Sequence, residues 1–433
     1  MLTAMASLTA HITTFNCGRS LPSTTHLASS LFDNTATSLP PDLIVLCLQE
    51  IAPIGYAFLG GSFLAPYFSK FSTIVQNAVS QQFDSNADYT PLVIQNAGLT
   101  GLMVFARSDV QESIRWIETA AVGVGMYEMG NKGAVGARVY IDGDDDTPVP
   151  MTFVSAHLAP MEDQCERRNA DWKSICEGLV FTRVNDASKP SNPTEDAQPL
   201  LQSSSPESTS SQSTLFSPLS HTFFAGDLNY RTADTAPSET DHKLWPHPTS
   251  SPSHPSWRDL WANDQLNREL RAQNTLHLLA EAPVAFPPTY KYSSAAQKAA
   301  ANGTPLPSGG EDGVWPWAKH RVPSWCDRVL FLAGAKPEVQ RYAALPVQPT
   351  SDHRPVTLVA RVPLRRPGKE GDVKVPFRMR KDWRERRAVA RRYEVLVGVG
   401  AYLALTWEGE AMLLATVVGV LGGYVALRAV LAG

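Results

Sequence analysis

Cysteine is scarce in this sequence, and no two cysteines stand close together. The five residues are scattered over a chain of 433 residues: Cys17, Cys47, Cys165, Cys176 and Cys326. Closely spaced pairs of the kind that bind zinc or exchange disulfides are absent, which argues against both kinds of site. An odd number of isolated cysteines is typical of a protein from a reducing compartment.

Clustered positive charge is missing from most of the chain. The formal net charge is −4, yet residues 364–392 hold twelve Lys and Arg against four Asp and Glu. Residues 393–433 carry −2, which leaves −10 on residues 1–363, called the body below. An acidic body does not suit a nucleic-acid backbone, which is bound by clustered Lys and Arg. We therefore expect no nucleic-acid partner.

Long apolar runs are missing everywhere except near the C-terminal end. The first ten residues lack Lys, Arg and a long apolar stretch, so we expect no secretory signal there. Residues 411–427 contain no charge, and residues 395–407 form a shorter uncharged run. A helix that crosses a bilayer needs about 20 apolar residues, with a range of roughly 17–25, so only the later run is long enough alone.

A basic segment, residues 364–392, precedes both apolar runs. Lys and Arg stay on the cytoplasmic side of a membrane and are attracted by anionic lipid. We interpret residues 364–392 as a basic linker and residues 393–433 as a membrane anchor that keeps the body in the cytosol. The anchor is either one long helix or a hairpin that turns at residues 408–410. A buried terminal helix of a soluble domain is the alternative.

Short apolar segments in the body are typical of buried strands. They occur at residues 43–48, 102–105, 134–140, 151–155, 222–225, 329–332 and 356–360. Residues 163–181 show a helical repeat, and strands mixed with helices indicate an α/β sandwich of stacked sheets. Residues 182–220 are rich in Ser, Pro, Thr and Gln, and we expect a disordered insert because they offer too little apolar surface to fold.

Polar or titratable side chains recur at the ends of these apolar segments. They are Asn16, Glu50, His157, Asp227, Asn229, Asp327, Asp352 and His353. A single Asp or Asn after a strand indicates no more than a turn. Recurrence at six strand ends instead predicts one site, because the sheet fixes positions there while the loops vary.

Two motifs carry a family resemblance. Residues 226–231 read Gly-Asp-Leu-Asn-Tyr-Arg, and residues 321–328 read Arg-Val-Pro-Ser-Trp-Cys-Asp-Arg. Both resemble signatures of the inositol polyphosphate 5-phosphatases. Supporting matches follow in the family's order at residues 48–50, 130–133, 155–158, 167–171, 287–291 and 351–355. Over residues 8–362 the resemblance implies the four-layer α/β sandwich of the endonuclease/exonuclease/phosphatase superfamily, with two packed β-sheets flanked by helices.

The resemblance and the chemistry of phosphate hydrolysis together suggest roles for the polar side chains. Mg²⁺ takes oxygen ligands, and the expected ones are Glu50, Asn16 and Asp352. The expected catalytic residues are Asp227, His353, His157, Asn229 and Asp327. Asp227 would activate the attacking water, while His353, held by Asp327 in this family, would donate to the phosphoryl group. No Ser or Cys nucleophile is required, so Cys326 is expected to be a packing residue.

Basic and aromatic residues in the motifs are the expected substrate contacts. They are Asn131, Lys132, Tyr230, Arg231, Tyr290, Lys291, Lys319 and Arg321, of which the last four positions match those that hold the 4-phosphate in the family. Lys and Arg suit phosphate by charge. The apolar tail favours a lipid, phosphatidylinositol 4,5-bisphosphate, and small tail-anchored members of the family suggest the endoplasmic reticulum.

Two positions depart from the family pattern. Cys17-Gly18 replaces a segment that normally supplies a second Asn near the metal, and Pro160 stiffens the loop after His157. Two alternatives stay open: a nuclease or sphingomyelinase of the same superfamily, and a catalytically idle phosphoinositide-binding tether. The acidic body argues against the first. The second would be expected to lack a catalytic side chain, and none is missing.

Overall fold

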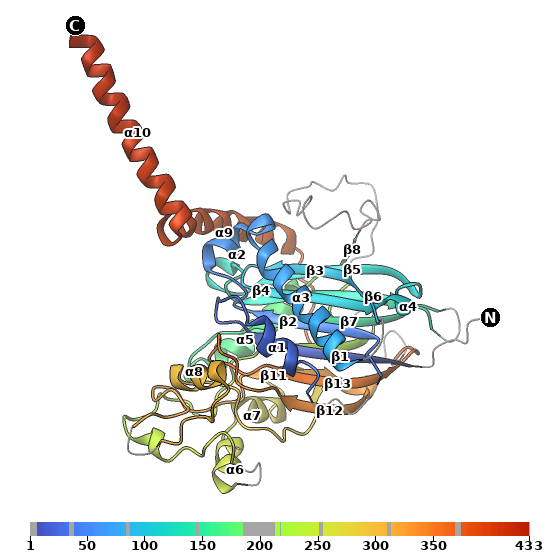
Figure 1. Ribbon diagram of the computed structural model, residues 1–433. Helices are drawn as coiled ribbons and strands as arrows, with labels where there is room; N and C mark the ends of the chain where they lie inside the picture. The colour runs from blue at the N-terminus through green and yellow to red at the C-terminus, as the bar shows by residue number, and fades with distance from the viewer. Residues whose placement is uncertain are drawn as a thin grey trace.

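The structure of the protein is a computed structural model that describes residues 7–33, 39–83, 87–143, 147–184, 213–216, 218–250, 254–309, 313–368 and 374–432. Two β-sheets lie face to face at its centre (Figure 1). Within the described residues the first sheet has the order β12 (Glu338–Ala344), β13 (Val356–Pro363), β1 (Ser7–Asn16), β2 (Leu43–Gln49), β4 (Thr100–Arg107) and β3 (Tyr89–Ala97). The second has the order β10 (Leu279–Glu281), β11 (Asp327–Leu332), β9 (His221–Asp227), β7 (Val149–His157), β6 (Gly133–Ile141), β5 (Ile114–Gly123) and β8 (Thr182–Arg183).

Helices cover the outer faces of both sheets. The first sheet is covered by α1 (Thr24–Ser30), α2 (Ile54–Leu59) and α3 (Ala65–Gln82), and the second by α5 (Cys165–Gly178) and α7 (Gln265–Arg271). Further elements lie in the connections: α4 (Ser108–Gln111), α6 (Pro255–Ala262), α8 (Ser294–Asn302), η1 (Gly61–Phe63), η2 (Met126–Glu128), η3 (Asp241–Lys243) and η4 (Ala333–Ala335). The predicted four-layer sandwich is confirmed.

The core explains why the strands appear as unbroken apolar runs. One cluster fills the space between the sheets, with Ile12 and Val45 of the first sheet and Phe153 of the second among its members. Two further clusters lie under the outer helices, around Phe71 on one side and Trp172 on the other. Strands with both faces buried lack the alternation of apolar and polar residues that a half-exposed strand shows.

Both ends of the predicted insert, residues 182–220, have ordered structure: Thr182–Arg183 form β8, and residues 213–216 and 218–220 are described. Residues 185–212 and residue 217 lie outside the described residues. Ser213 and Leu215 are buried, and the Ser213 hydroxyl accepts a hydrogen bond of 2.7 Å from Arg138. The end of the segment therefore belongs to the core, because Leu215 and Phe216 pack with Trp172.

The C-terminal region forms two helices, α9 (Trp383–Leu405) and α10 (Trp407–Ala432), joined at Thr406. Figure 1 shows α9 lying across the body next to α2, while α10 projects away from it. The arrangement is thus neither one continuous helix nor a hairpin. The boundary that we expected between linker and anchor, at residues 392 and 393, falls inside α9. Only α10 among the described helices is long and apolar enough to cross a membrane, and it is exposed from Glu410 onward.

Replacing Gly226 with Ala should destabilise the fold. A Cβ atom at this position of β9 would lie 1.9 Å from the carbonyl oxygen of Ala156 on the neighbouring strand β7. Overpacking of this kind costs about 1–3 kcal/mol, occasionally more, and thermal unfolding of the full chain in detergent would measure it. Gly334→Ala is the control, because a Cβ atom there meets nothing within 4 Å. Equal melting temperatures for the two variants would contradict the prediction.

Candidate active site

The register of the strands brings the predicted polar residues to one edge of the sandwich. In the first sheet Asn16 at the end of β1 lies opposite Gln49 at the end of the parallel strand β2. In the second sheet Asp227 pairs with His157 of the parallel strand β7 and with Asp327 of the antiparallel strand β11. Since the two sheets face one another, both sets of strand ends meet.

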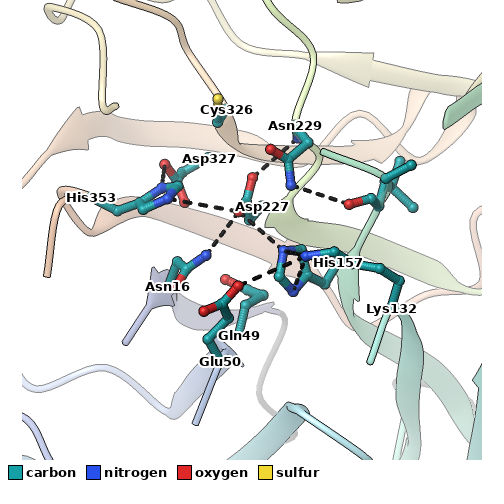
Figure 2. A network of polar contacts seen from close by, with 12 residues as sticks. Asn16, Gln49, Glu50, Lys132, His157, Asp227, Asn229, Cys326, Asp327 and His353 are labelled. Carbon is teal, nitrogen blue, oxygen red and sulfur yellow. Dashed lines mark hydrogen bonds and ion pairs between the residues drawn. The ribbon is translucent and has the colours of Figure 1, made fainter. Parts of the chain in front are cut away.

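Asp227 lies at the centre of the resulting network (Figure 2). Its Oδ2 atom accepts a hydrogen bond of 2.9 Å from Asn16 Nδ2 and lies 3.3 Å from Nε2 of His157. Nε2 of His353 lies 3.9 Å from the same oxygen. The other oxygen, Oδ1, accepts the backbone N–H of Asn229 at 3.1 Å. Groups from both sheets therefore converge on one buried carboxylate.

The charges around Asp227 keep it ionised. Burial alone would raise its pKa, but His353 and the hydrogen bond with His157 outweigh burial and hold the pKa well below its usual range. For His353 burial alone would lower the pKa, but Asp327 and Asp227 outweigh it and raise the pKa to about 9. At neutral pH the site thus pairs a carboxylate with an imidazolium.

Asp327 fixes the orientation of His353. Its Oδ2 atom lies 2.9 Å from Nδ1 of His353 and accepts a hydrogen bond of 2.6 Å from the Thr289 hydroxyl. Both ionisable side chains are buried. Because Nδ1 is occupied by this carboxylate, Nε2 is the nitrogen that points toward Asp227 and the cleft.

Glu50 stands on the other side of the cleft. It follows β2 in a left-handed backbone conformation, with φ of 48°. Its carboxylate lies 3.0 Å from Arg19 Nε and 3.8 Å from Lys132 Nζ, and Lys132 also contacts the His157 ring. Burial would raise the pKa of Glu50, but the net direction is downward because of the neighbouring His157, Lys132 and Arg19. Burial and the nearby Lys132 lower the pKa of His157.

The donor set fits a hard divalent cation at Glu50. The carboxylates of Glu50 and Asp227 are close enough for each to disfavour ionisation of the other, a repulsion that a bound cation would relieve. Asn16 lies between them, and its Oδ1 atom accepts the N–H of Gly18 at 3.0 Å. Among the described residues, Asp227, Asp327 and His353 form a different group, whose possible ligand atoms all lie within 4.8 Å of one another. The Nδ1 atom of His353 is already hydrogen-bonded to Asp327, so these three side chains are better suited to hydrogen bonding than to binding a metal.

Asp352, which we expected to be a metal ligand, lies beside Lys291 and His353. Its carboxylate lies 2.6 Å from Lys291 Nζ and 4.0 Å from His353 Nε2. A hollow of about 400 Å³ borders these residues, and Gly18 and His320 also line it. Lys291 and Asp352 therefore connect the hollow with the network around Asp227.

Other predicted substrate residues surround this surface at different depths. The ring of Tyr290 lies 4.4 Å from the His353 ring, and the Arg231 guanidinium lies 4.6 Å above Tyr290. Arg231 also donates to the backbone and side chain of Asn229, while its buried Nη1 atom has no hydrogen-bond partner among the described residues. Asn229 Nδ2 donates to Leu158 O at 3.1 Å, so this amide supports the loop as well as the site.

The remaining predicted contacts differ in exposure. Lys319 is exposed, and Arg321 Nε lies 3.7 Å from Glu162 at the rim. Asn131 has a buried Oδ1 atom without a partner in the described part of the chain. Tyr230 is fully buried, and its hydroxyl donates to Asn169 Oδ1 and lies 2.8 Å from the Thr275 hydroxyl, which can donate to it. Tyr230 therefore lies in the core, away from the cleft, and we do not retain it among the proposed substrate contacts.

Three supporting residues were missed by reasoning from the sequence. Gln49 Nε2 donates to Ser155 Oγ at 3.1 Å and so ties the two sheets together directly behind Glu50. Thr289 holds Asp327, and Arg19 pairs with Glu50. Gln49 and Thr289 stand inside motifs already quoted, which was an available signal, whereas nothing in the sequence pointed to Arg19. Cys326 points away from Asp227 in Figure 2.

Comparison with known proteins agrees with this geometry. Residues 13–359 match endonuclease/exonuclease/phosphatase family 2. The type II inositol 1,4,5-trisphosphate 5-phosphatase of Mus musculus is 26% identical over 283 residues, 65% of this chain and 23% of that protein. The phosphatidylinositol 3,4,5-trisphosphate 5-phosphatase 2B of Danio rerio is 27% identical over 282 residues, 63% of this chain and 19% of that protein. The match thus spans about a fifth to a quarter of these relatives' length.

A solved structure is similar over nearly the whole chain. It is the inositol polyphosphate 5-phosphatase domain of a synaptojanin in complex with inositol (1,4)-bisphosphate and a calcium ion. The TM-score is 0.58 and the identity 20%, and the match covers 92% of this chain and 93% of that chain. At this identity the likeness establishes the fold. Together with the motifs, the family match confirms the resemblance to the inositol polyphosphate 5-phosphatases, and the chain belongs to endonuclease/exonuclease/phosphatase family 2.

Proposed function

We propose that this chain hydrolyses the 5-phosphate of phosphatidylinositol 4,5-bisphosphate at a membrane surface. The observation that supports this most is the convergence of Asn16, His157 and His353 on the Asp227 carboxylate, beside a hollow that contains Lys291. Hydrolysis of a phosphate ester requires a positioned water, a proton acceptor and positive charge around the phosphoryl group. This site offers the Asp227 carboxylate as a proton acceptor and the His353 imidazolium as positive charge within one cleft.

The residues suit direct attack by water. A water at Asp227 would lose its proton to that carboxylate while its oxygen bonds to phosphorus and the bond to the inositol 5-oxygen breaks. The protonated Nε2 of His353 would donate to a phosphoryl oxygen as negative charge develops there. His157 and the unpartnered Nη1 of Arg231 are further candidates to bind the phosphate. The leaving inositol oxygen takes up a proton, so inorganic phosphate and an alcohol are the products.

Glu50 and Asn16 are the proposed ligands of a divalent cation, which we propose to be Mg²⁺. Such a cation supplies positive charge to the phosphoryl group when bound. The calcium ion in the synaptojanin complex supports the choice of a hard divalent cation. Asp352 would act on the water or the substrate through its contact with Lys291.

The C-terminal helices support a lipid substrate. Helix α10 has 26 residues and so a length of about 39 Å, more than the roughly 30 Å of a hydrocarbon core. Apolar side chains on α9, among them Leu396, Val399 and Leu405, are also exposed. We propose that α10 spans the membrane with the body on its cytosolic side, and that the membrane is that of the endoplasmic reticulum.

Phosphate release from a panel of substrates tests the proposal. The full chain with Mg²⁺ would be assayed on vesicles that contain each phosphoinositide, and on soluble inositol 1,4,5-trisphosphate. We expect release from lipids with a 5-phosphate and none from 3- or 4-monophosphates. Nicking of plasmid DNA or cleavage of sphingomyelin would support the superfamily alternative, and binding without release would support an idle tether.

Arg321→Ala should lower kcat/KM more for substrates that carry a 4-phosphate than for substrates without it. Arg321 lies at the rim with its guanidinium partly exposed, where it can form a charge-assisted hydrogen bond worth about 1.5–3 kcal/mol. We therefore expect kcat/KM for phosphatidylinositol 4,5-bisphosphate to fall at least about tenfold, and that for phosphatidylinositol 5-phosphate to change little. Arg361→Ala is the control, since Arg361 is exposed toward the other end of β13 from His353. Equal losses on both lipids would contradict a 4-phosphate contact.

A further inference from the structure

Helix α9 is packed tightly against the body through two glycines. A Cβ atom on Gly55 of α2 would lie 2.9 Å from the backbone N of Tyr402, and one on Gly398 of α9 would lie 3.0 Å from Cβ of Phe58. The Tyr402 ring packs edge-on against Tyr56, with ring centroids 5.9 Å apart. Such close approach of two helix backbones requires glycine at these positions.

A basic residue of α9 binds the end of α2. The Arg391 guanidinium donates to the carbonyl oxygens of Phe58 and Leu59, the latter at 3.0 Å, and its Nη1 atom lies 3.2 Å from Glu394. The last carbonyls of a helix lack intrahelical partners, so a cation that binds them is stabilising. Helix α2 begins four residues after Glu50.

Glu394 of α9 binds a second loop of the body. Its Oε1 atom accepts the backbone N–H of Gly130 at 2.7 Å. Tyr393 stacks on Tyr127 of the same loop, with ring centroids 5.1 Å apart and planes inclined by 25°. This loop leads directly to Lys132, whose ammonium contacts His157 and lies 3.8 Å from Glu50.

Helix α9 thus contacts the Lys132 loop directly and the Glu50 loop only through α2, and the ends of these two loops meet in the active site. One loop connects Glu50 to α2, and the other carries Lys132 into β6. On the basis of the function proposed above, we propose that α9 is a positioning element for catalysis, and that Glu394 acts through Gly130 to hold Lys132 against Glu50 and His157. Glu394 touches no reacting atom, so it is a positioning residue.

The same contacts connect the active site to the apolar helix. Helix α10 begins after a single residue, Thr406, and its Glu408 accepts a hydrogen bond of 3.1 Å from the hydroxyl of Tyr56 on α2. A Cβ atom on Gly409 would lie 2.1 Å from Tyr402 O, so the junction itself is closely packed. Anchoring of α10 would therefore fix the orientation of α9 and of the two loops.

Loss of the Glu394 contact should loosen the loop without unfolding the chain. Gly130 is also held from the other side, because its carbonyl oxygen accepts the N–H of Leu99 at 2.8 Å. Glu394→Ala is expected to lower kcat about tenfold while KM for a short-chain lipid in detergent stays within about twofold. Glu394→Gln keeps an acceptor oxygen and should restore most of the rate. Glu385→Ala, an exposed acidic residue of α9, is the matched control.

Hydrogen exchange measures the loss of the contact between Glu394 and Gly130 directly. Amide protection of residues 124–133 should fall in Glu394→Ala, return in Glu394→Gln and stay unchanged in Glu385→Ala. Full activity of Glu394→Ala, with this protection lost, would overturn the inference. If the unmodified chain releases no phosphate, the proposed function fails instead, so the two failures are distinguishable.

If Glu394→Ala does not fold, a second pair of variants tests whether the packing of α9 against α2 supports catalysis. Gly398→Leu would push α9 away from Phe58, whereas a Cβ atom on Gly400 meets nothing within 4 Å. Gly398→Leu should lower kcat at least about fivefold, and Gly400→Leu should retain it. Equal rates for the two variants would overturn the inference.

Discussion

Asp227→Asn should reduce phosphate release by about a hundredfold to ten thousandfold, the usual contribution of a general base. Asn has nearly the same shape and can still accept the N–H of residue 229, but it cannot take a proton from water. The positively charged surroundings keep the Asp227 carboxylate ionised at neutral pH. Replacing this carboxylate therefore removes the proposed proton acceptor. Initial rates on vesicles containing phosphatidylinositol 4,5-bisphosphate would measure the effect.

A neighbouring carboxylate provides the control for this substitution. Asp234 lies a few residues further along the same loop, is largely exposed and pairs with Arg268. Asp234→Asn should keep nearly full activity. A near-ultraviolet circular dichroism spectrum would verify that Asp227→Asn retains its packing. Activity within tenfold of the unmodified chain, in a folded Asp227→Asn protein, would remove Asp227 from the role of base.

Asp327→Asn should move the alkaline limit of activity toward lower pH. The pKa of His353 is raised to about 9 because Asp327 and Asp227 stabilise the imidazolium. In the unmodified chain His353 is therefore protonated at neutral pH, and activity that needs this proton falls as pH rises through about 9. Removing the Asp327 charge lowers the pKa of His353, so the fall begins at a lower pH. Profiles of kcat/KM against pH would measure the shift.

Loss of the His353 imidazole should lower activity more than Asp327→Asn does. His353→Gln is expected to cost about a hundredfold or more and to abolish the alkaline fall that this group produces. His277→Gln is a suitable control, because His277 lies under α5 and accepts from Trp172 Nε1 rather than facing the cleft. An unchanged pH profile in both Asp327→Asn and His353→Gln would show that another group controls the alkaline limit.

Local patterns in the sequence were sufficient for much of the fold. Continuous apolar runs predicted the central strands, because strands buried on both faces have no polar alternation. Polar residues at strand ends predicted a single site, since side chains at the ends of neighbouring strands meet at one edge. The family resemblance implied that Asp327 holds His353, and the two side chains lie 2.9 Å apart. Tyr230 shows the limit of motif matching, because its neighbour Asn229 is in the site while its own ring is in the core.

What the sequence alone determined is the family, the layered sandwich, the set of polar residues at the strand ends and the apolar character of α10. The family and the four-layer sandwich follow from motifs that resemble a known family, whereas the strand ends and the apolar helix follow from composition and periodicity within short stretches of chain. Only the tertiary structure decided that α9 packs on α2, that Glu394 binds Gly130 and that Arg19 pairs with Glu50. The physical reason is that contacts between distant segments depend on how complete elements pack, and no local pattern specifies which partner a helix face or a charge will have.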